Sequence, residues 1–222
     1  RRDSNGNGIG DACEVVVPLS DPNVSTELQG LGPHSETGYA VSRAGDVNHD
    51  GTADFLVGAP GYSPDGGPTH AGAALLFLGS TNPTDRATPD VIFVGASANE
   101  RAGVALAGGV DLNCDGTPDL VIGAEQMDRT VDPAVPTGSG KVYVIFFDPH
   151  DAVHYPKLND GNPSTTGDVV SLALVGQPGG IPGIVYTGAA LGDLAGTAVA
   201  VGSLKEGPGA NEILIGAPGR AP

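Results

Sequence analysis

Residues 46–54 read Asp46-Val47-Asn48-His49-Asp50-Gly51-Thr52-Ala53-Asp54, and the pattern D-x-N-x-D-G-x-x-D returns 65 residues later as Asp111-Leu112-Asn113-Cys114-Asp115-Gly116-Thr117-Pro118-Asp119. Positions 1, 3, 5 and 9 offer side-chain oxygens, position 7 offers a backbone carbonyl, and the glycine at position 6 permits a sharp turn. Ca²⁺ is held by oxygen ligands of these kinds. The sequence therefore predicts two calcium-binding loops, with ligands from Asp46, Asn48, Asp50, Thr52 and Asp54 in the first and from Asp111, Asn113, Asp115, Thr117 and Asp119 in the second.

An EF-hand shares the first six positions, but it needs a Glu at position 12 and a helix on each side. Position 12 is Val57 in the first loop and Ile122 in the second, each inside an apolar run typical of a strand. The lack of helical periodicity also argues against a dockerin-type site. A plain Asp/Asn-Gly turn without an ion is the remaining alternative, and two loops at the same place of a repeat argue against it.

The composition indicates an all-β protein. The chain of 222 residues has 36 Gly and 19 Pro, which separate short apolar runs of the kind that form strands between tight turns. The net charge of −16 and the lack of a basic cluster argue against nucleic acid as a partner. No apolar stretch is long enough to cross a bilayer, so we expect no membrane insertion in this segment. No signal peptide is visible and the first residue is not Met, so we expect a fragment of a longer protein.

Two copies of a longer unit surround the loops. Around the first loop we expect strands at 38–45, 55–61, 72–79 and 91–95, and around the second at 103–109, 120–125, 140–146 and 172–176. Four strands in about 65 residues match a β-propeller blade, a four-stranded antiparallel sheet. The small side chains of the first strand in each copy suit the crowded position near a propeller axis. The alternative, a β-sandwich, rarely repeats a whole four-strand unit.

A third copy is degenerate. Residues 196–202 and 212–218 fit its first two strands, but 203–211 lacks the aspartates of the loop. Two insertions, at about 148–166 and 177–193, account for its later position. The phase is open, because 183–186 could also begin the copy. We therefore expect a partial β-propeller of about three four-stranded antiparallel blades.

The repeat resembles the FG-GAP repeat of integrin α-chain propellers and many bacterial surface proteins. Gly38-Tyr39 stands at the FG position and Gly58-Ala59-Pro60 at the GAP position. The second copy departs in part, with Gly103-Val104 and Gly123-Ala124-Glu125, and the third restores Gly216-Ala217-Pro218. The resemblance covers about 26–222. It implies a seven-bladed propeller of which about three blades are present, so the remaining blades are expected partners.

The first 14 residues resemble the closing half of a thrombospondin type 3 repeat. The family's calcium pattern falls on Asp3, Asn5, Asn7, Ile9 through its carbonyl, and Asp11, and Asn replaces Asp at two positions. The resemblance gives Cys13 a disulfide partner upstream of residue 1. Residues 15–25 read as a linker before the propeller segment.

The predicted function is a calcium-binding module outside the cell. Loops of low affinity suit surroundings with millimolar Ca²⁺, which predicts a secreted or cell-surface protein. The first hypothesis is adhesion or recognition of an extracellular protein or glycan, with the two insertions as variable surface. The second is a non-catalytic accessory propeller of a secreted hydrolase or lyase, and the third is a spacer without a ligand. No catalytic motif occurs, so no enzymatic activity is expected in this segment.

Overall fold

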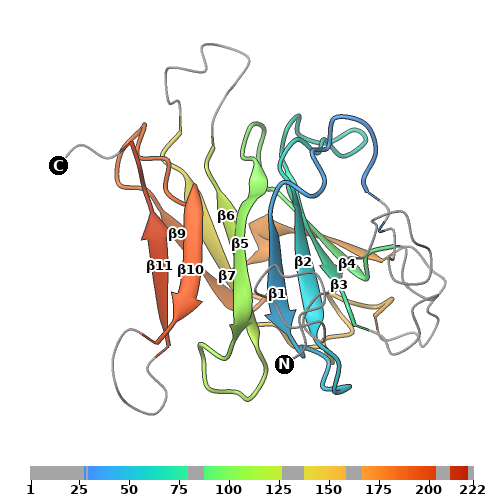
Figure 1. Ribbon diagram of the computed structural model, residues 1–222. Helices are drawn as coiled ribbons and strands as arrows, with labels where there is room; N and C mark the ends of the chain where they lie inside the picture. Colours follow the sequence, from blue (N-terminus) through green and yellow to red (C-terminus); the bar gives the residue numbers. More distant parts are fainter. Residues whose placement is uncertain are drawn as a thin grey trace, which may run out of the picture.

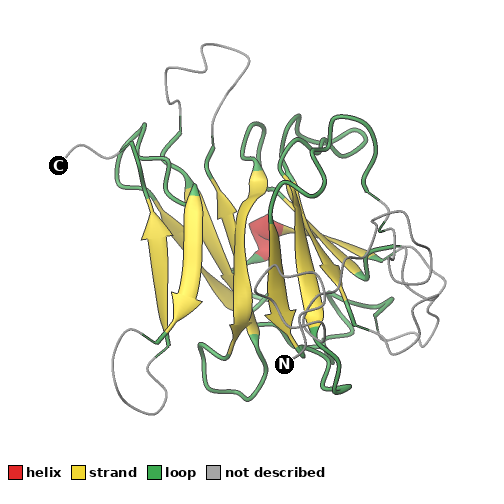
Figure 2. Cartoon of the chain, viewed as in Figure 1, coloured by secondary structure: helices red, strands yellow, loops and turns green. Residues whose placement is uncertain are grey.

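The computed structural model describes residues 28, 30–79, 88–126, 138–158, 167–203 and 211–219, and these form three β-sheets (Figures 1 and 2). The predicted N-terminal repeat (1–14) and linker (15–25) lie outside the described residues. The strands of the first sheet, in spatial order, are β1 (Val41–Gly45), β2 (Asp54–Ala59), β3 (Ala73–Phe77), β4 (Val91–Val94) and β8 (Asp168–Ser171). Those of the second are β5 (Ala102–Val110), β6 (Asp119–Ala124), β7 (Lys141–Ile145) and β9 (Gly183–Thr187), and those of the third are β10 (Ala198–Gly202) and β11 (Glu212–Gly216).

Neighbouring strands are antiparallel except for β4 and β8, which are parallel. The inner strands β1, β5 and β10 pack on one another, with β5 in the middle, as Figure 1 shows. The all-β class and the partial propeller are thus confirmed. The prediction that the small-sided strand of each copy is the innermost one agrees with this packing.

The two aspartate-rich loops close the first hairpin of their sheets. Gly45 pairs with Asp54 across β1 and β2, and Val110 pairs with Asp119 across β5 and β6. In both hairpins the register shifts just before the loop, between Arg43 and Gly45 in the first and between Gly108 and Val110 in the second. A bulge bends its strand and redirects the following residues, so both loops leave their sheets with the same geometry.

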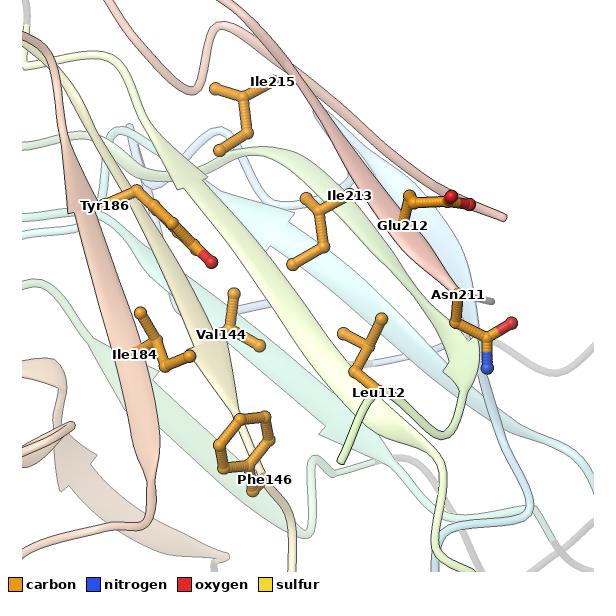
Figure 3. Close-up of a pocket in the computed structure, with 9 residues that line it drawn as sticks. All are labelled: Leu112, Val144, Phe146, Ile184, Tyr186, Asn211, Glu212, Ile213 and Ile215. Carbon is orange, nitrogen blue, oxygen red and sulfur yellow. The ribbon is translucent and has the colours of Figure 1, made fainter. Parts of the chain in front are cut away.

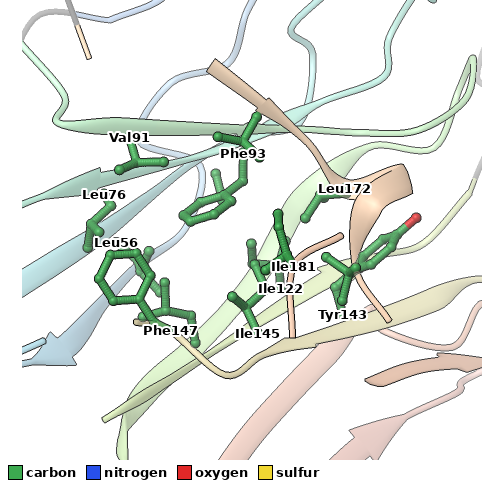
Figure 4. Packing of buried hydrophobic residues seen from close by; sticks show 14 of the residues in the cluster. Leu56, Leu76, Val91, Phe93, Ile122, Tyr143, Ile145, Phe147, Leu172 and Ile181 are labelled. Atoms are coloured by element: carbon green, nitrogen blue, oxygen red, sulfur yellow. The ribbon is translucent and has the colours of Figure 1, made fainter. Parts of the chain in front are cut away.

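Two hydrophobic layers join the sheets. One lies between the first and second sheets and includes Leu56, Phe93, Ile122 and Ile145 (Figure 4). The other joins the second and third sheets and includes Val121, Val144 and, at its partly buried side, Ile213.

Glycine is required where the sheets approach most closely. A Cβ added at Gly58 would lie 2.0 Å from the carbonyl oxygen of Gly103, and one at Gly123 would lie 2.2 Å from that of Gly196. The GAP glycines of the first two sheets therefore pack on a glycine in or just before the first strand of the next sheet.

The third copy keeps the backbone of the first two. Glu36, Arg101 and Leu194 have φ values of 57°, 56° and 53°, and each is followed two residues later by a glycine with positive φ. This agreement supports the predicted start of the third copy near residue 196. It also excludes the alternative in which residues 183–186 begin that copy, because they form β9 of the second sheet.

The predicted fourth strand of the second copy, at 172–176, is wrong. Leu172–Leu174 is a 3₁₀ helix, and the hydroxyl of Ser171 accepts a hydrogen bond from the amide of Ala173 at its start. Residues 168–171 instead form β8, which extends the first sheet to five strands. The predicted insertion at 177–193 is wrong as well, because β9 lies within it.

The real excursion is the connection 146–182 between β7 and β9, which crosses to the outer edge of β4. Its anchor is the buried Tyr155, whose ring centroid lies 6.2 Å from that of Phe93 and 5.0 Å from that of Phe147. No helix in the described ranges is long and apolar enough to cross a membrane.

Candidate metal centre

In the first loop, side-chain oxygens accept hydrogen bonds from backbone amides of the same loop. The side chain of Asp46 accepts hydrogen bonds from the amides of Asp50 (3.0 Å) and Gly51 (2.9 Å). Asn48 Oδ1 accepts from the Asp50 amide at 3.2 Å, and Asp50 Oδ1 accepts from the Thr52 amide at 2.7 Å. The predicted ligands at positions 1, 3 and 5 are therefore brought onto one small turn.

The second loop repeats these contacts at the equivalent positions. Asp111 accepts from the amides of Asp115 (3.2 Å) and Gly116 (2.8 Å), and Asn113 Oδ1 accepts from the Asp115 amide at 2.9 Å. Asp115 Oδ1 accepts from the Thr117 amide at 2.8 Å. Two separate stretches of chain thus reach the same local structure, which supports the prediction that they are one repeated device.

The turn depends on left-handed backbone at positions 4 and 6. His49 and Cys114 occupy position 4 with φ of 59° and 65°, and Gly51 and Gly116 occupy position 6 with φ of 85° and 97°. Glycine adopts such values at no steric cost, whereas other residues adopt them less often. Cys114 is an exposed free cysteine.

The aspartates at position 9 are buried beneath the loops. Asp54 Oδ2 accepts from the Val47 amide at 2.7 Å, and Asp119 Oδ2 accepts from the Leu112 amide at 2.6 Å. Asp54 Oδ1 also accepts from the Gly79 amide at 2.6 Å. Each position-9 carboxylate therefore ties the end of its loop to the residue at position 2.

Burial raises the pKa of both position-9 carboxyls from 3.8 to about 6. The backbone hydrogen bonds from Val47 and Leu112 oppose that rise, and the carboxylates at positions 1 and 5 add to it. Negative charge is thus costly at this site, and a nearby cation would offset that cost.

One oxygen of the second loop is left without a protein partner. Within the described part of the chain, Oδ1 of Asp119 is buried and accepts no hydrogen bond. The equivalent atom of the first loop, Asp54 Oδ1, accepts a hydrogen bond from the amide of Gly79, two residues after β3. The equivalent residue after β7 is Phe147, whose side chain packs in the core. A buried carboxylate oxygen without a donor calls for an explanation, and a bound cation would supply one.

These features fit a calcium ion. The donors are oxygens of carboxylates, amides and a carbonyl, as Ca²⁺ requires. Among the described residues no group of three or more His, Cys, Asp or Glu side chains is already gathered as a metal cluster. The carboxylates bond to loop amides instead, so binding would require their side chains to turn toward the ion. The predicted N-terminal ligands, Asp3 to Asp11, lie outside the described residues.

The sequence did not reveal a partly buried ionic network between the first two sheets. Arg101 Nε lies 2.9 Å from Glu125 Oε1, and its Nη2 lies 3.0 Å from Glu36 Oε2. Glu125 replaces the proline of the GAP motif, and this departure was the available signal. Glu100 is fully buried and accepts hydrogen bonds from the amide and hydroxyl of Ser97, from Lys141 Nζ, and from the Tyr143 hydroxyl.

A cavity of about 350 Å³ lies between the second and third sheets (Figure 3). Apolar side chains from β7, β9 and β11 form most of its wall, and Asn211 and Glu212 supply polar groups. The cavity lies where the described part of the third sheet has two strands against the four of the second. Its lining residues are Leu112, Val144, Phe146, Ile184, Tyr186, Asn211, Glu212, Ile213 and Ile215.

Comparison with known families agrees with this geometry. A model of the FG-GAP repeat matches residues 37–77 and 102–145, which hold β1–β3 and β5–β7 with their two loops. Two segments of the chain therefore match the FG-GAP repeat. The predicted resemblance to this repeat is confirmed, whereas the thrombospondin resemblance stays a prediction.

Two kinds of protein are among the relatives. Over 141 residues the chain is 38% identical to the phosphatidylinositol-glycan-specific phospholipase D of Bos taurus, which covers 61% of the chain and 16% of the relative. It is 34% identical to integrin alpha-PS2 of Drosophila melanogaster, over 50% of the chain and 8% of the relative. It is 35% identical to integrin alpha-IIb of Mus musculus, over 48% of the chain and 10% of the relative. The chain thus spans at most about a sixth of these relatives.

Proposed function

We propose that this chain is a calcium-stabilised segment of an extracellular β-propeller that serves adhesion or recognition. The observation that carries the proposal is the pair of matching loops, each with three carboxylates, an amide and a sharp glycine turn. Three carboxylates this close repel one another unless a cation is present. The ion would be held by positions 1, 3, 5, 7 and 9 of each loop, and it would supply positive charge at the turn of each hairpin.

Calcium would act here through stability. A ligand that binds only the folded state stabilises that state by mass action. The loops close the innermost hairpins, so an ordered loop also fixes the strands that pack on the next sheet. An extracellular location follows from the millimolar Ca²⁺ that low-affinity loops require.

The recognition partner we propose is an extracellular protein or a glycan. The relation to integrin alpha chains supports this class. The test is binding of the full chain to an array of glycans and matrix proteins, once with calcium and once with a chelator. A specific, calcium-dependent hit supports recognition. If the chain bound no glycan or matrix protein under either condition, the result would instead indicate that it is a spacer without a ligand.

A second candidate function is that of an accessory propeller in a secreted hydrolase or lyase whose catalytic domain lies elsewhere. The observation that favours it is the relation to proteins named phospholipase D. The sequence adjoining this segment distinguishes the two candidates. A catalytic domain supports the accessory function, and further adhesive modules or a membrane anchor support recognition.

A further inference from the structure

The two candidate calcium loops are packed against each other. Gly45, the residue before Asp46, contacts Pro118, the residue before Asp119. A Cβ added at Gly45 would lie 2.7 Å from Pro118 Cβ and 3.0 Å from Gly109 Cα. The first ligand of one loop and the last ligand of the other are therefore each one residue away from the same tight contact.

A hydrogen bond joins the loops at a second point. His49 Nε2 lies 3.2 Å from Thr117 Oγ1. His49 stands between the predicted ligands Asn48 and Asp50, and the carbonyl of Thr117 is itself a predicted ligand. Ordering either loop therefore restricts a residue that belongs to the other.

The same relation occurs at the next seam. In the third copy Glu212 pairs with Gly202, as Asp119 pairs with Val110 in the second copy. Asn211 therefore occupies the position in the third copy that Pro118 occupies in the second. Asn211 Nδ2 donates a hydrogen bond to the carbonyl oxygen of Asp111 at 2.7 Å. The residue at position 8 of one copy thus supports the beginning of the preceding loop at both seams.

We propose that cation binding to the two loops is positively coupled through this contact. An ion in the second loop fixes Thr117 and Pro118, and these residues hold Gly45 and His49 in the bound arrangement. The first loop then loses less conformational entropy when it binds its own ion. The inference rests on the proposed function, because it requires both loops to bind calcium.

The test is calorimetric titration of the full chain with Ca²⁺ alone. Asp115→Ala leaves the first site and Asp50→Ala leaves the second, which gives the two association constants in isolation. Coupling makes the product of the two stepwise constants of the parent larger than the product of these isolated constants. We expect a factor of about five, at the lower end of usual couplings because the contact is small.

Two variants remove the contact without touching a ligand. Pro118→Ala introduces the residue that the first loop already has at position 8, and His49→Asn shortens the side chain while tolerating left-handed backbone. Each of these two variants should reduce the coupling factor toward one. The matched control is His70→Asn, also an exposed histidine with positive φ (48°), which should leave the factor unchanged.

Hydrogen exchange gives a second measurement that does not depend on calorimetry. In Asp50→Ala, calcium bound at the second loop should slow exchange of the Gly51 amide in the first loop. Two independent sites with a factor of one, and no change at Gly51, would overturn the coupling and leave the proposed function intact. Failure of both loops to bind calcium would overturn both.

Discussion

At the scale of single residues, substitution of the position-5 aspartates is the most direct test of the proposed ions. Asp50→Ala and Asp115→Ala each remove one carboxylate from an exposed turn. A site filled at 100 times its Kd contributes about 2.7 kcal/mol, which corresponds to a rise in Tm of roughly 5–10 °C for a domain of this size. Each variant should therefore lose part of the calcium-induced rise seen in thermal unfolding. Asp65→Ala, an exposed aspartate outside both loops, is the control and should keep the full rise.

A second residue-scale prediction concerns Arg101, which is 4% exposed and pairs with the equally buried Glu125. Arg101→Met removes the ion pair between Arg101 and that buried carboxylate. Breaking a buried pair costs about 3–5 kcal/mol, so urea unfolding should show a loss of this order. Arg43→Met changes an exposed arginine and should have little effect. If Arg101→Met were as stable as Arg43→Met, the ion pairs of Arg101 would contribute nothing measurable to the stability of the fold.

The spacing of residues in the sequence predicts the loops only in part. The spacing of Asp, Asn and Gly predicted the turn of each loop, because few chains place oxygens and a left-handed glycine in that order. It did not predict that Asp54 and Asp119 are tied to the amide at position 2. Burial depends on the strands that pack around a residue, and spacing carries no such information. The partners of Arg101 were missed for the same reason, since they lie 24 and 65 positions away.

At the scale of elements, the first hairpin of each copy was predictable and the connection 146–182 was not. The hairpins follow from apolar runs on either side of a turn signal. The run Leu172-Ala173-Leu174-Val175 is too short for its periodicity to distinguish a strand from a helical turn. Leu172 in the 3₁₀ helix and Val175 just after it are buried in the core, whereas Ala173 and Leu174 are exposed. The fourth strand of the second sheet is β9 instead.

The glycines at the seams give an element-scale prediction. Gly58→Ala would place a methyl group against the backbone of Gly103, with no flexible side chain to yield. Forced overpacking costs about 1–3 kcal/mol, and denaturant unfolding should show at least this loss. Gly202→Ala is the matched control, because nothing lies within 4 Å of its added Cβ. A neutral Gly58→Ala would show that the first two sheets are not packed as described.

At the scale of the whole molecule, apolar side chains of the second and third sheets are exposed where these two sheets meet. Ile184 and Tyr186 on β9 are each 43% exposed, and Leu214 on β11 is 61% exposed. Open seams of this kind favour association, as do the uncapped ends of repeat arrays. The isolated chain should therefore self-associate at micromolar concentration in analytical ultracentrifugation.

The double variant Ile184→Ser/Tyr186→Ser identifies the surface responsible. It should reduce the association without changing the circular dichroism spectrum. Val153→Ser, at an exposed position in the connection 146–182 (82% exposed), serves as the control and should associate like the parent. A monomeric parent at high concentration would contradict the interpretation of this surface as an open seam.

The most direct test of the calcium proposal is a crystal structure determined from crystals grown in calcium chloride. We predict one ion in each loop, held by oxygens of positions 1, 3, 5, 7 and 9 at about 2.3–2.6 Å. We also predict that Oδ1 of Asp119, buried without a partner in the described chain, faces the ion. Clear density for both loops with water or nothing at these positions would contradict it.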